Sequence, residues 1–199
     1  MNQYNYILFD VDGVLARATN SADEILMENS VTLEEFFRKW DTSEIVASFE
    51  AGNITAEEFA KLRSNELEMR LKPDTIIKIL RERKSILYDG VEELLDKLSK
   101  SNYKLACLSN TNVLHWDSII GKEIFDRFFC EKFLSFEIGY IKPKKEIFMV
   151  VLNTLQCQAN EVLYFDDSKK NIEAAISLGF DAVHVDDFDD LVVKMNHIL

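Results

Sequence analysis

A short apolar run near the N-terminus ends in two aspartates and a glycine, and this feature constrains the fold more than any other. Residues 6–9 (Tyr-Ile-Leu-Phe) are apolar without alternation, and Asp10-Val11-Asp12-Gly13 follows directly. Such a run is typical of a strand that is buried on both faces of a parallel sheet. The aspartates would then lie at the carboxyl end of the strand, where open α/β sheets bind their ligands. Taken alone, the same residues also fit a strand followed by an ordinary Asp-Gly turn.

From residue 88 onward, strand and helix patterns alternate along the chain. The apolar runs that we interpret as further strands lie at residues 104–108, 133–136, 162–165 and 182–185. Alternation of this kind favours right-handed crossovers and therefore a parallel sheet with helices on both faces. The predicted fold class is α/β, with a Rossmann-like parallel sheet as its core.

The segment between the first strand and residue 88 shows helix patterns only. Phe36, Phe37 and Trp40 lie on one helical face there, and we interpret them as the core of a helical unit rather than as a substrate-stacking surface. About four helices and no strand are predicted in this segment. The expected units are a core made of residues 1–14 and 87–199 and a small helical-bundle cap made of residues 15–86.

The charge balance limits the partners of the protein. Lys and Arg number 23 against 35 Asp and Glu, which gives a net charge of −12 and disfavours nucleic acid and anionic membrane surfaces. No apolar run approaches the roughly 20 residues that span a bilayer, and no signal-type segment is visible at the N-terminus. We expect a cytoplasmic protein, a monomer or a weak homodimer, that binds a small molecule.

Polar side chains follow three of the expected strands. They are Asp10 and Asp12, then Ser109 and Asn110, then Asp166 and Asp167, and a loop that ends at Lys142 and Pro143 could reach the same edge of the sheet. Two carboxylates about 4 Å apart repel each other by roughly 4 kcal/mol at an effective dielectric constant near 20. A cluster of four therefore needs a cation. Oxygen-only ligands suit Mg²⁺, which commonly binds a substrate phosphate as well.

These motifs resemble those of the haloacid dehalogenase superfamily, in its phosphatase branch with a helical cap. The resemblance covers nearly the whole chain, because all four motifs occur in order with the cap between the first and the second. They are Asp10-Val11-Asp12-Gly13-Val14, Leu108-Ser109-Asn110-Thr111, Lys142 within residues 139–143, and Phe165-Asp166-Asp167-Ser168. Residues 49–59 and 108–115 are further similar to bacterial α-D-glucose-1-phosphate phosphatases and to the phosphatase domain of soluble epoxide hydrolases.

The resemblance implies a role for each motif residue in catalysis. Asp10 resembles the nucleophile that forms an aspartyl-phosphate, and Asp12 the general acid and base. Ser109 and Asn110 would bind the phosphoryl oxygens. Lys142 would bridge Asp10 and the phosphate.

The metal ligands that the resemblance implies are again aspartates. Asp10 and the backbone carbonyl of Asp12 would contact Mg²⁺, Asp167 would be a direct ligand, and Asp166 would act partly through water. For His115, which follows the second motif, packing at a helix start is the favoured interpretation. The run from Asp186 to Asp190 is interpreted as a solvated helix start.

The function expected from these residues is Mg²⁺-dependent hydrolysis of a small phosphate monoester, a sugar phosphate in the first instance, through an aspartyl-phosphate on Asp10. A phosphomutase similar to β-phosphoglucomutase would share every motif and is the main alternative. A receiver domain also has a phospho-accepting aspartate, but its acids come in another order and it lacks a helical insert. A dehalogenase needs no acid at the position of Asp12.

Overall fold

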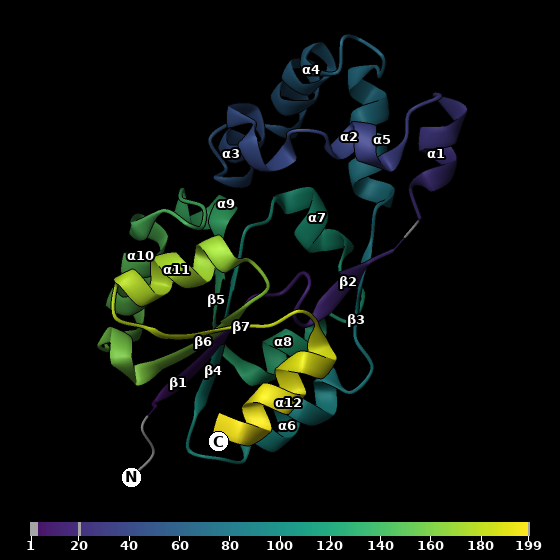
Figure 1. Ribbon diagram of the computed structural model, residues 1–199. Coiled ribbons are helices and arrows are strands. Elements are labelled where there is room, and N and C mark those ends of the chain that lie inside the picture. Colours follow the sequence, from purple (N-terminus) through teal and green to yellow (C-terminus); the bar gives the residue numbers. More distant parts are fainter. Residues whose placement is uncertain (1–3, 20, 199) are drawn as a thin grey trace.

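Five parallel strands form the central sheet of the computed structural model, which describes residues 4–19 and 21–198 (Figure 1). The strand order is β5-β4-β1-β6-β7, so the strand that carries the two aspartates is the central one. The bounds are β1 (Tyr6–Phe9), β4 (Lys104–Ser109), β5 (Phe129–Leu134), β6 (Val162–Asp166) and β7 (Asp181–His184). The predicted α/β fold with a parallel sheet is confirmed.

Helices cover both faces of the sheet, as the alternating pattern predicted (Figure 1). Ile7 and Phe9 of β1 pack in one apolar cluster, with α6, α8 and α12, whereas Tyr6 and Leu8 pack in another, with α10 and α11. None of the described helices combines the length and apolar character that a membrane-spanning helix needs. The bounds are α6 (Val91–Ser99), α7 (Val113–Ser118), α8 (Glu123–Phe128), α9 (Ser135–Ile138), α10 (Lys145–Leu155), α11 (Lys169–Ser177) and α12 (Phe188–Ile198), with a 3₁₀ turn at Ala159–Glu161.

A helical cap with its own core lies above the carboxyl end of the sheet (Figure 1). Phe36, Phe49 and Phe59 are buried at the centre of this cap, and Phe49 stacks on Phe59 with ring centroids 4.4 Å apart. Of the three aromatic residues predicted for the cap core, Phe36 is buried in it, whereas Phe37 and Trp40 are partly buried against it and also line the cleft below the cap. The bounds among the described residues are α1 (Asp23–Glu28), α2 (Leu33–Phe37), α3 (Glu44–Glu50), α4 (Ala56–Glu66) and α5 (Pro73–Glu82), with a 3₁₀ turn at Trp40–Thr42.

The two chain crossings between core and cap form a small antiparallel ribbon. It consists of β2 (Ala16–Ala18) and β3 (Ser85–Leu87), so the expectation of no strand in residues 15–86 was wrong. Three-residue strands are too short to show a period in the sequence. The boundaries after residue 14 and before residue 87 stay our proposal for the division into core and cap.

The edge strand β5 also differs from its predicted position. The apolar run suggested residues 133–136, whereas the strand covers Phe129–Leu134 and α9 begins at Ser135. Cys130 and Glu131 are exposed. An edge strand that is partly solvated carries polar residues, and these residues hid the first half of β5.

Candidate active site

Three carboxylates meet at the carboxyl end of the two central strands. Asp10 follows β1 and Asp166 ends β6, and the register that pairs Phe9 with Phe165 brings them together. Asp10, Asp166 and Asp167 each offer an oxygen atom within 4.8 Å of the others. Ser109, the last residue of β4, is buried at the same sheet edge. The strand ends predicted to converge therefore do so.

A buried lysine lies among these carboxylates. The Nζ atom of Lys142 is 2.9 Å from Oδ1 of Asp10 and 2.7 Å from Oδ2 of Asp166, and it also donates to the backbone oxygen of Leu108 at 3.0 Å. The Asn110 side chain positions the lysine loop by accepting from the backbone N–H of Lys142 at 2.7 Å and donating to its carbonyl at 3.0 Å. A direct phosphate contact of the Asn110 side chain stays a prediction.

The two aspartates that share Lys142 differ in their electrostatics. Burial raises the pKa of Asp10 well above its usual value, and the attraction of Lys142 does not compensate. Burial also acts on Asp166, but Lys142, the Tyr164 hydroxyl and the backbone N–H of Ser168 together lower its pKa. Because Asp166 also accepts from the Asn171 amide, its oxygens are engaged within the protein. Asp10 is thus the less compensated anion of the pair.

The donor set fits a divalent cation. Burial and the neighbouring Asp166 raise the pKa of Asp167, which indicates that the cluster lacks positive charge. Three carboxylates against one ammonium leave two net negative charges, and oxygen ligands are those that Mg²⁺ prefers. Asp10 and Asp167 are the best candidates for direct ligands, because the oxygens of Asp166 already accept hydrogen bonds.

Gly13 allows the Asp167 carboxylate to lie against the first motif. Its φ of +85° is in the left-handed region, and a Cβ atom built there would lie 2.2 Å from Oδ2 of Asp167. Any side chain at this position would displace Asp167 and strain the backbone. Gly13 is therefore required for the close approach between the loop after β1 and Asp167, which follows β6.

Asp12 is held by two partners outside the carboxylate cluster. Ser85 of β3 donates to its Oδ1 at 2.8 Å, and the Nε2 atom of His115 lies 2.8 Å from its Oδ2. Burial alone would raise the pKa of Asp12, but these hydrogen bonds outweigh it and the pKa lies below its usual value. His115 thus contacts a candidate catalytic group, although the sequence favoured a packing role. Its position directly after the second motif allowed a place at the border of the leaving-group pocket, but gave no indication of a contact with Asp12.

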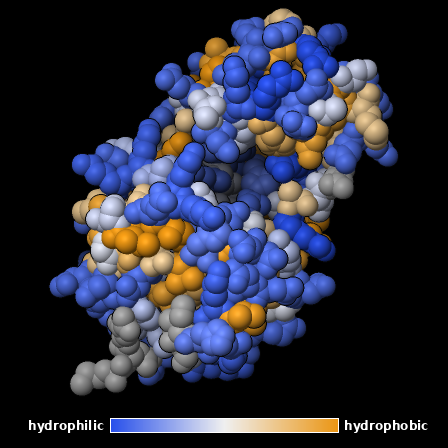
Figure 2. Space-filling view, in the orientation of Figure 1, coloured by the Kyte–Doolittle hydropathy of each residue, from blue (hydrophilic) through white to orange (hydrophobic). Residues whose placement is uncertain are grey.

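A cleft between cap and core surrounds these residues (Figure 2). It contains two cavities of about 310 and 690 Å³. Both are lined by Trp40 and Glu50 from the cap and by Asn110 and Asp167 from the core. A substrate bound to the carboxylate cluster would therefore contact cap side chains.

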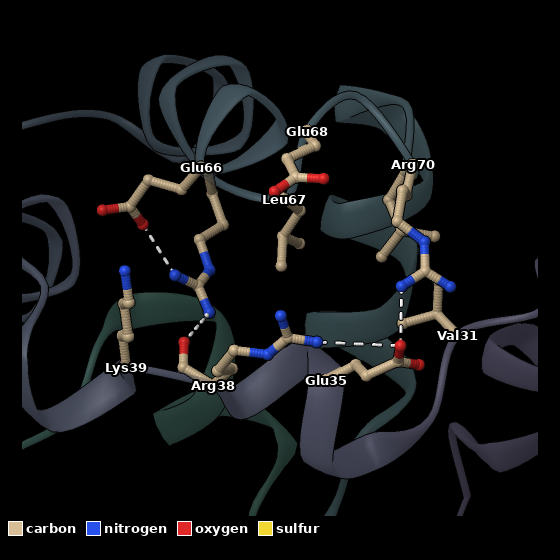
Figure 3. Close-up of a pocket in the computed structure, with 10 residues that line it drawn as sticks. Val31, Glu35, Arg38, Lys39, Glu66, Leu67, Glu68 and Arg70 are labelled. Atoms are coloured by element: carbon tan, nitrogen blue, oxygen red, sulfur yellow. Dashed lines mark hydrogen bonds and ion pairs between the residues drawn. The ribbon is translucent and has the colours of Figure 1, made fainter.

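A further pocket of about 270 Å³ lies within the cap and has a different character (Figure 3). The Oε1 atom of Glu35 lies between two guanidinium groups, 3.7 Å from Nη2 of Arg38 and 2.6 Å from Nη1 of Arg70. The Oε2 atom of Glu66 is 2.6 Å from Nη1 of the buried Arg63. These charged side chains neutralise one another and connect the cap helices. The cleft, rather than this pocket, is the candidate active site.

Comparison with known proteins identifies the family of this chain. The sequence profile of the haloacid dehalogenase-like hydrolases matches residues 4–179. A D-ribitol-5-phosphate phosphatase of Bacteroides thetaiotaomicron is 28% identical over 173 residues, which cover 81% of each chain. A phosphoglycolate phosphatase of Haemophilus influenzae is 26% identical over 89% of this chain and 83% of the relative.

Solved structures of similar fold extend over almost the whole chain. A HAD family enzyme from Bacteroides thetaiotaomicron, in complex with magnesium and inorganic phosphate, has a TM-score of 0.72 at 25% identity and covers 92% of this chain and 94% of its own. A HAD-like family hydrolase from Porphyromonas gingivalis has a TM-score of 0.77 at 22% identity, with 99% and 98% covered. The second similarity concerns the fold alone.

Proposed function

We propose a specific activity for this chain, which belongs to the haloacid dehalogenase-like hydrolases. The protein is a phosphatase that requires Mg²⁺ and hydrolyses a small phosphate monoester of the sugar or polyol phosphate class. The observation that carries this proposal is the group of Asp10, Asp166 and Asp167 around the buried Lys142. The named phosphatase activities of relatives that match most of the chain support it.

The positions of the four motifs suggest how the phosphoryl group would bind. Lys142 would contact the phosphoryl oxygens next to Asp10, and Ser109 lies at the same strand edge to donate a hydrogen bond. Mg²⁺ would be held by Asp10, Asp167 and the backbone carbonyl of Asp12, and through water by Asp166. When bound, it would neutralise charge that develops on the phosphoryl oxygens. Oriented binding next to a carboxylate favours in-line displacement.

Asp10 and Asp12 would divide the reaction between them. An oxygen of Asp10 would attack phosphorus, and the bond from phosphorus to the ester oxygen would break. Because its contacts lower the pKa of Asp12 in the free protein, Asp12 would have to gain a proton when the phosphate ester binds beside it. It would then give this proton to the leaving alkoxide and later take one from the water that hydrolyses the aspartyl-phosphate. His115 and Ser85 would orient Asp12 for both proton transfers.

The alternative functions lack a specific supporting observation. A receiver domain would not carry a helical cap with its own core, and here such a cap covers the site. A dehalogenase expels halide and has no use for a proton donor at Asp12. A phosphomutase has the same core motifs, and the similarity to monoester phosphatases favours hydrolysis.

Removal of the metal tests the proposal directly. Chelation should abolish hydrolysis of p-nitrophenyl phosphate, and Mg²⁺ should restore it, whereas Ca²⁺ should inhibit because its larger and looser coordination shell misaligns Asp10. In Asp167→Asn, kcat/KM should fall by about 100-fold or more and half-activation should need much more Mg²⁺, since even indirect metal partners contribute 10- to 100-fold.

The matched control removes an aspartate outside the cleft. Asp189 is exposed in the first turn of α12, and Asp189→Asn should keep the activity and the Mg²⁺ titration of the unchanged protein. A normal Mg²⁺ titration of Asp167→Asn would contradict the proposed metal site.

A further inference from the structure

We propose that Glu50 of the cap selects substrates whose leaving group is neutral and carries hydroxyl groups, and that it discriminates against leaving groups with a second anionic group. This inference rests on the proposed function, because it concerns the part of the same substrate that lies beyond the phosphoryl group. The relatives include phosphatases named for both classes, a polyol phosphate and an acid, so the family alone does not decide between them.

The cavity that would hold the leaving group lies directly beside the carboxylate cluster. Its volume of about 310 Å³ is at the lower limit of small-molecule sites, which suits a short carbon chain or one sugar ring. Asp12 and Asp167 line its core side, and Phe37, Trp40 and Leu80 supply apolar cap surface. Apolar rings next to polar groups suit a chain that has both C–H and hydroxyl groups.

Glu50 is the cap carboxyl group in this cavity, and half of its hydrogen-bonding capacity is unused. The Trp40 indole donates to Oε1 at 3.1 Å, whereas Oε2 has no hydrogen-bond partner among the described residues. Burial raises the pKa of Glu50 to about 7; Asp41 and Asp12 add to this effect, whereas the Trp40 hydrogen bond and His115 reduce it. No described lysine or arginine forms an ion pair with it. Glu50 is half-buried and lines the cavity, so a substrate hydroxyl group that enters the cavity can displace water and donate to Oε2.

The backbone around Glu50 is docked on the core, and the Trp40 indole holds its side chain. Ser135 donates from its hydroxyl to the carbonyl oxygen of Glu50 at 2.6 Å. Two residues later Gly52 has a φ of +70°, and a Cβ atom there would lie 2.2 Å from the backbone oxygen of Phe136. The cap therefore contacts α9 closely at this point. A fixed carboxyl group discriminates better than one on a mobile loop.

Arg83 supplies the complementary donor in the same cavity. It follows α5, and its guanidinium lies 4.2 Å from the centre of the Phe37 ring. A hydroxyl group can donate to Glu50 and accept from Arg83, whereas a carboxylate can only accept. In the complete site Asp167 would be neutralised by Mg²⁺ and Asp12 would carry the proton for the leaving group, so Glu50 is the anion that a second anionic group would meet in this cavity. Neutral hydroxyl groups therefore fit this lining better than anionic groups do.

Steady-state kinetics with paired substrates test this inference. The kcat/KM of the unchanged protein should be higher for ribitol 5-phosphate than for phosphoglycolate. Glu50→Ala should lower kcat/KM for ribitol 5-phosphate roughly 10-fold, as expected for one hydrogen bond to a charged group, and most of the change should be in KM. For phosphoglycolate, at a pH above the Glu50 pKa of about 7, Glu50→Ala and Glu50→Gln should both raise kcat/KM, because a repulsive charge is removed.

The control and a binding measurement separate this inference from the proposed function. Glu44→Gln removes an exposed carboxylate from the same helix α3 and should leave the ratio of the two substrates unchanged. Calorimetric titration of both phosphates into the Asp10→Asn chain, with and without Glu50→Gln, gives the same comparison without turnover. If the protein hydrolysed neither phosphate but still bound ribitol 5-phosphate more tightly than phosphoglycolate, the proposed function would be wrong and the inference about Glu50 would stand.

Three results would overturn the inference. One is an equal loss for both substrates in the Glu50 variants, which would indicate a structural role. Another is a preference of the unchanged protein for phosphoglycolate. The third is a preference for aminoethyl phosphate over ribitol 5-phosphate that disappears in Glu50→Gln, because Glu50 would then recognise a cation.

Discussion

Replacing Asp10 with Asn should abolish phosphate-ester hydrolysis while the fold stays at least as stable in metal-free buffer. The amide cannot attack phosphorus, so the expected loss of kcat is on the order of 10⁴-fold or more, as for the removal of other enzymatic nucleophiles. Asn occupies the same volume and keeps an oxygen for Lys142. The loss should therefore come from chemistry and not from unfolding.

The stability part of this prediction follows from the raised pKa of Asp10. An acid whose pKa is higher in the folded than in the unfolded state destabilises the fold above its folded pKa, and this penalty disappears as the pH falls toward the unfolded value. Asn removes the penalty at neutral pH. Thermal unfolding in EDTA should show a Tm equal to or above that of the unchanged protein. Substantial residual turnover would contradict the role of Asp10 as nucleophile, and a large decrease in Tm would contradict the electrostatic account.

Replacing Lys142 with Met should have the largest effect on stability. The Lys142 side chain is 1% exposed, and it is the cation that contacts both Asp10 and Asp166. Loss of one partner from a buried ionic group leaves uncompensated charge and costs about 3–5 kcal/mol. The activity should fall on the order of 10²- to 10³-fold as well, because a donor to the phosphoryl oxygens is removed.

The pH dependence and a double variant make this prediction specific. The neighbouring aspartates raise the pKa of Lys142 although burial lowers it, so its contribution to stability is present at neutral pH and is lost only as the pH rises through the folded value. Urea unfolding at pH 7 is the measurement. Adding Asp10→Asn to Lys142→Met should restore part of the stability. Lys145→Met, at an exposed position in α10, is the control, and a loss below about 1 kcal/mol in Lys142→Met would be typical of a surface pair instead.

Much of the fold follows from periodicity, because the apolar runs that form the buried strands contrast clearly with amphipathic helices. The central strand β1 and the strand β6 have fully buried residues, and both were predicted to within a residue. Once parallel strands are inferred, their polar ends must share an edge. This topological rule, together with the family motifs, predicts from the sequence that Asp10, Ser109, Lys142 and Asp166 belong to one site.

Contacts between residues far apart in the sequence were not predictable in the same way. The contact between Asp12 and His115 joins positions 103 residues apart, and that between Asp12 and Ser85 depends on the ribbon at the cap crossings. The position of Glu50 depends on how the cap docks on α9. None of these residues has a local pattern that sets it apart, since each takes its role from tertiary contacts.

The measurement that tests the central claim most directly is the mass of the peptide that contains Asp10 during turnover. Asp12→Asn should still allow attack on p-nitrophenyl phosphate, whose leaving group needs no proton, while hydrolysis of the intermediate becomes slow. Acid-quenched Asp12→Asn should therefore show a burst of nitrophenolate and one added phosphoryl group on the Asp10 peptide, and neither should appear when Asp10→Asn is added. A phosphoryl group on Ser109, or on no residue under burst conditions, would contradict the assignment of Asp10 as the nucleophile.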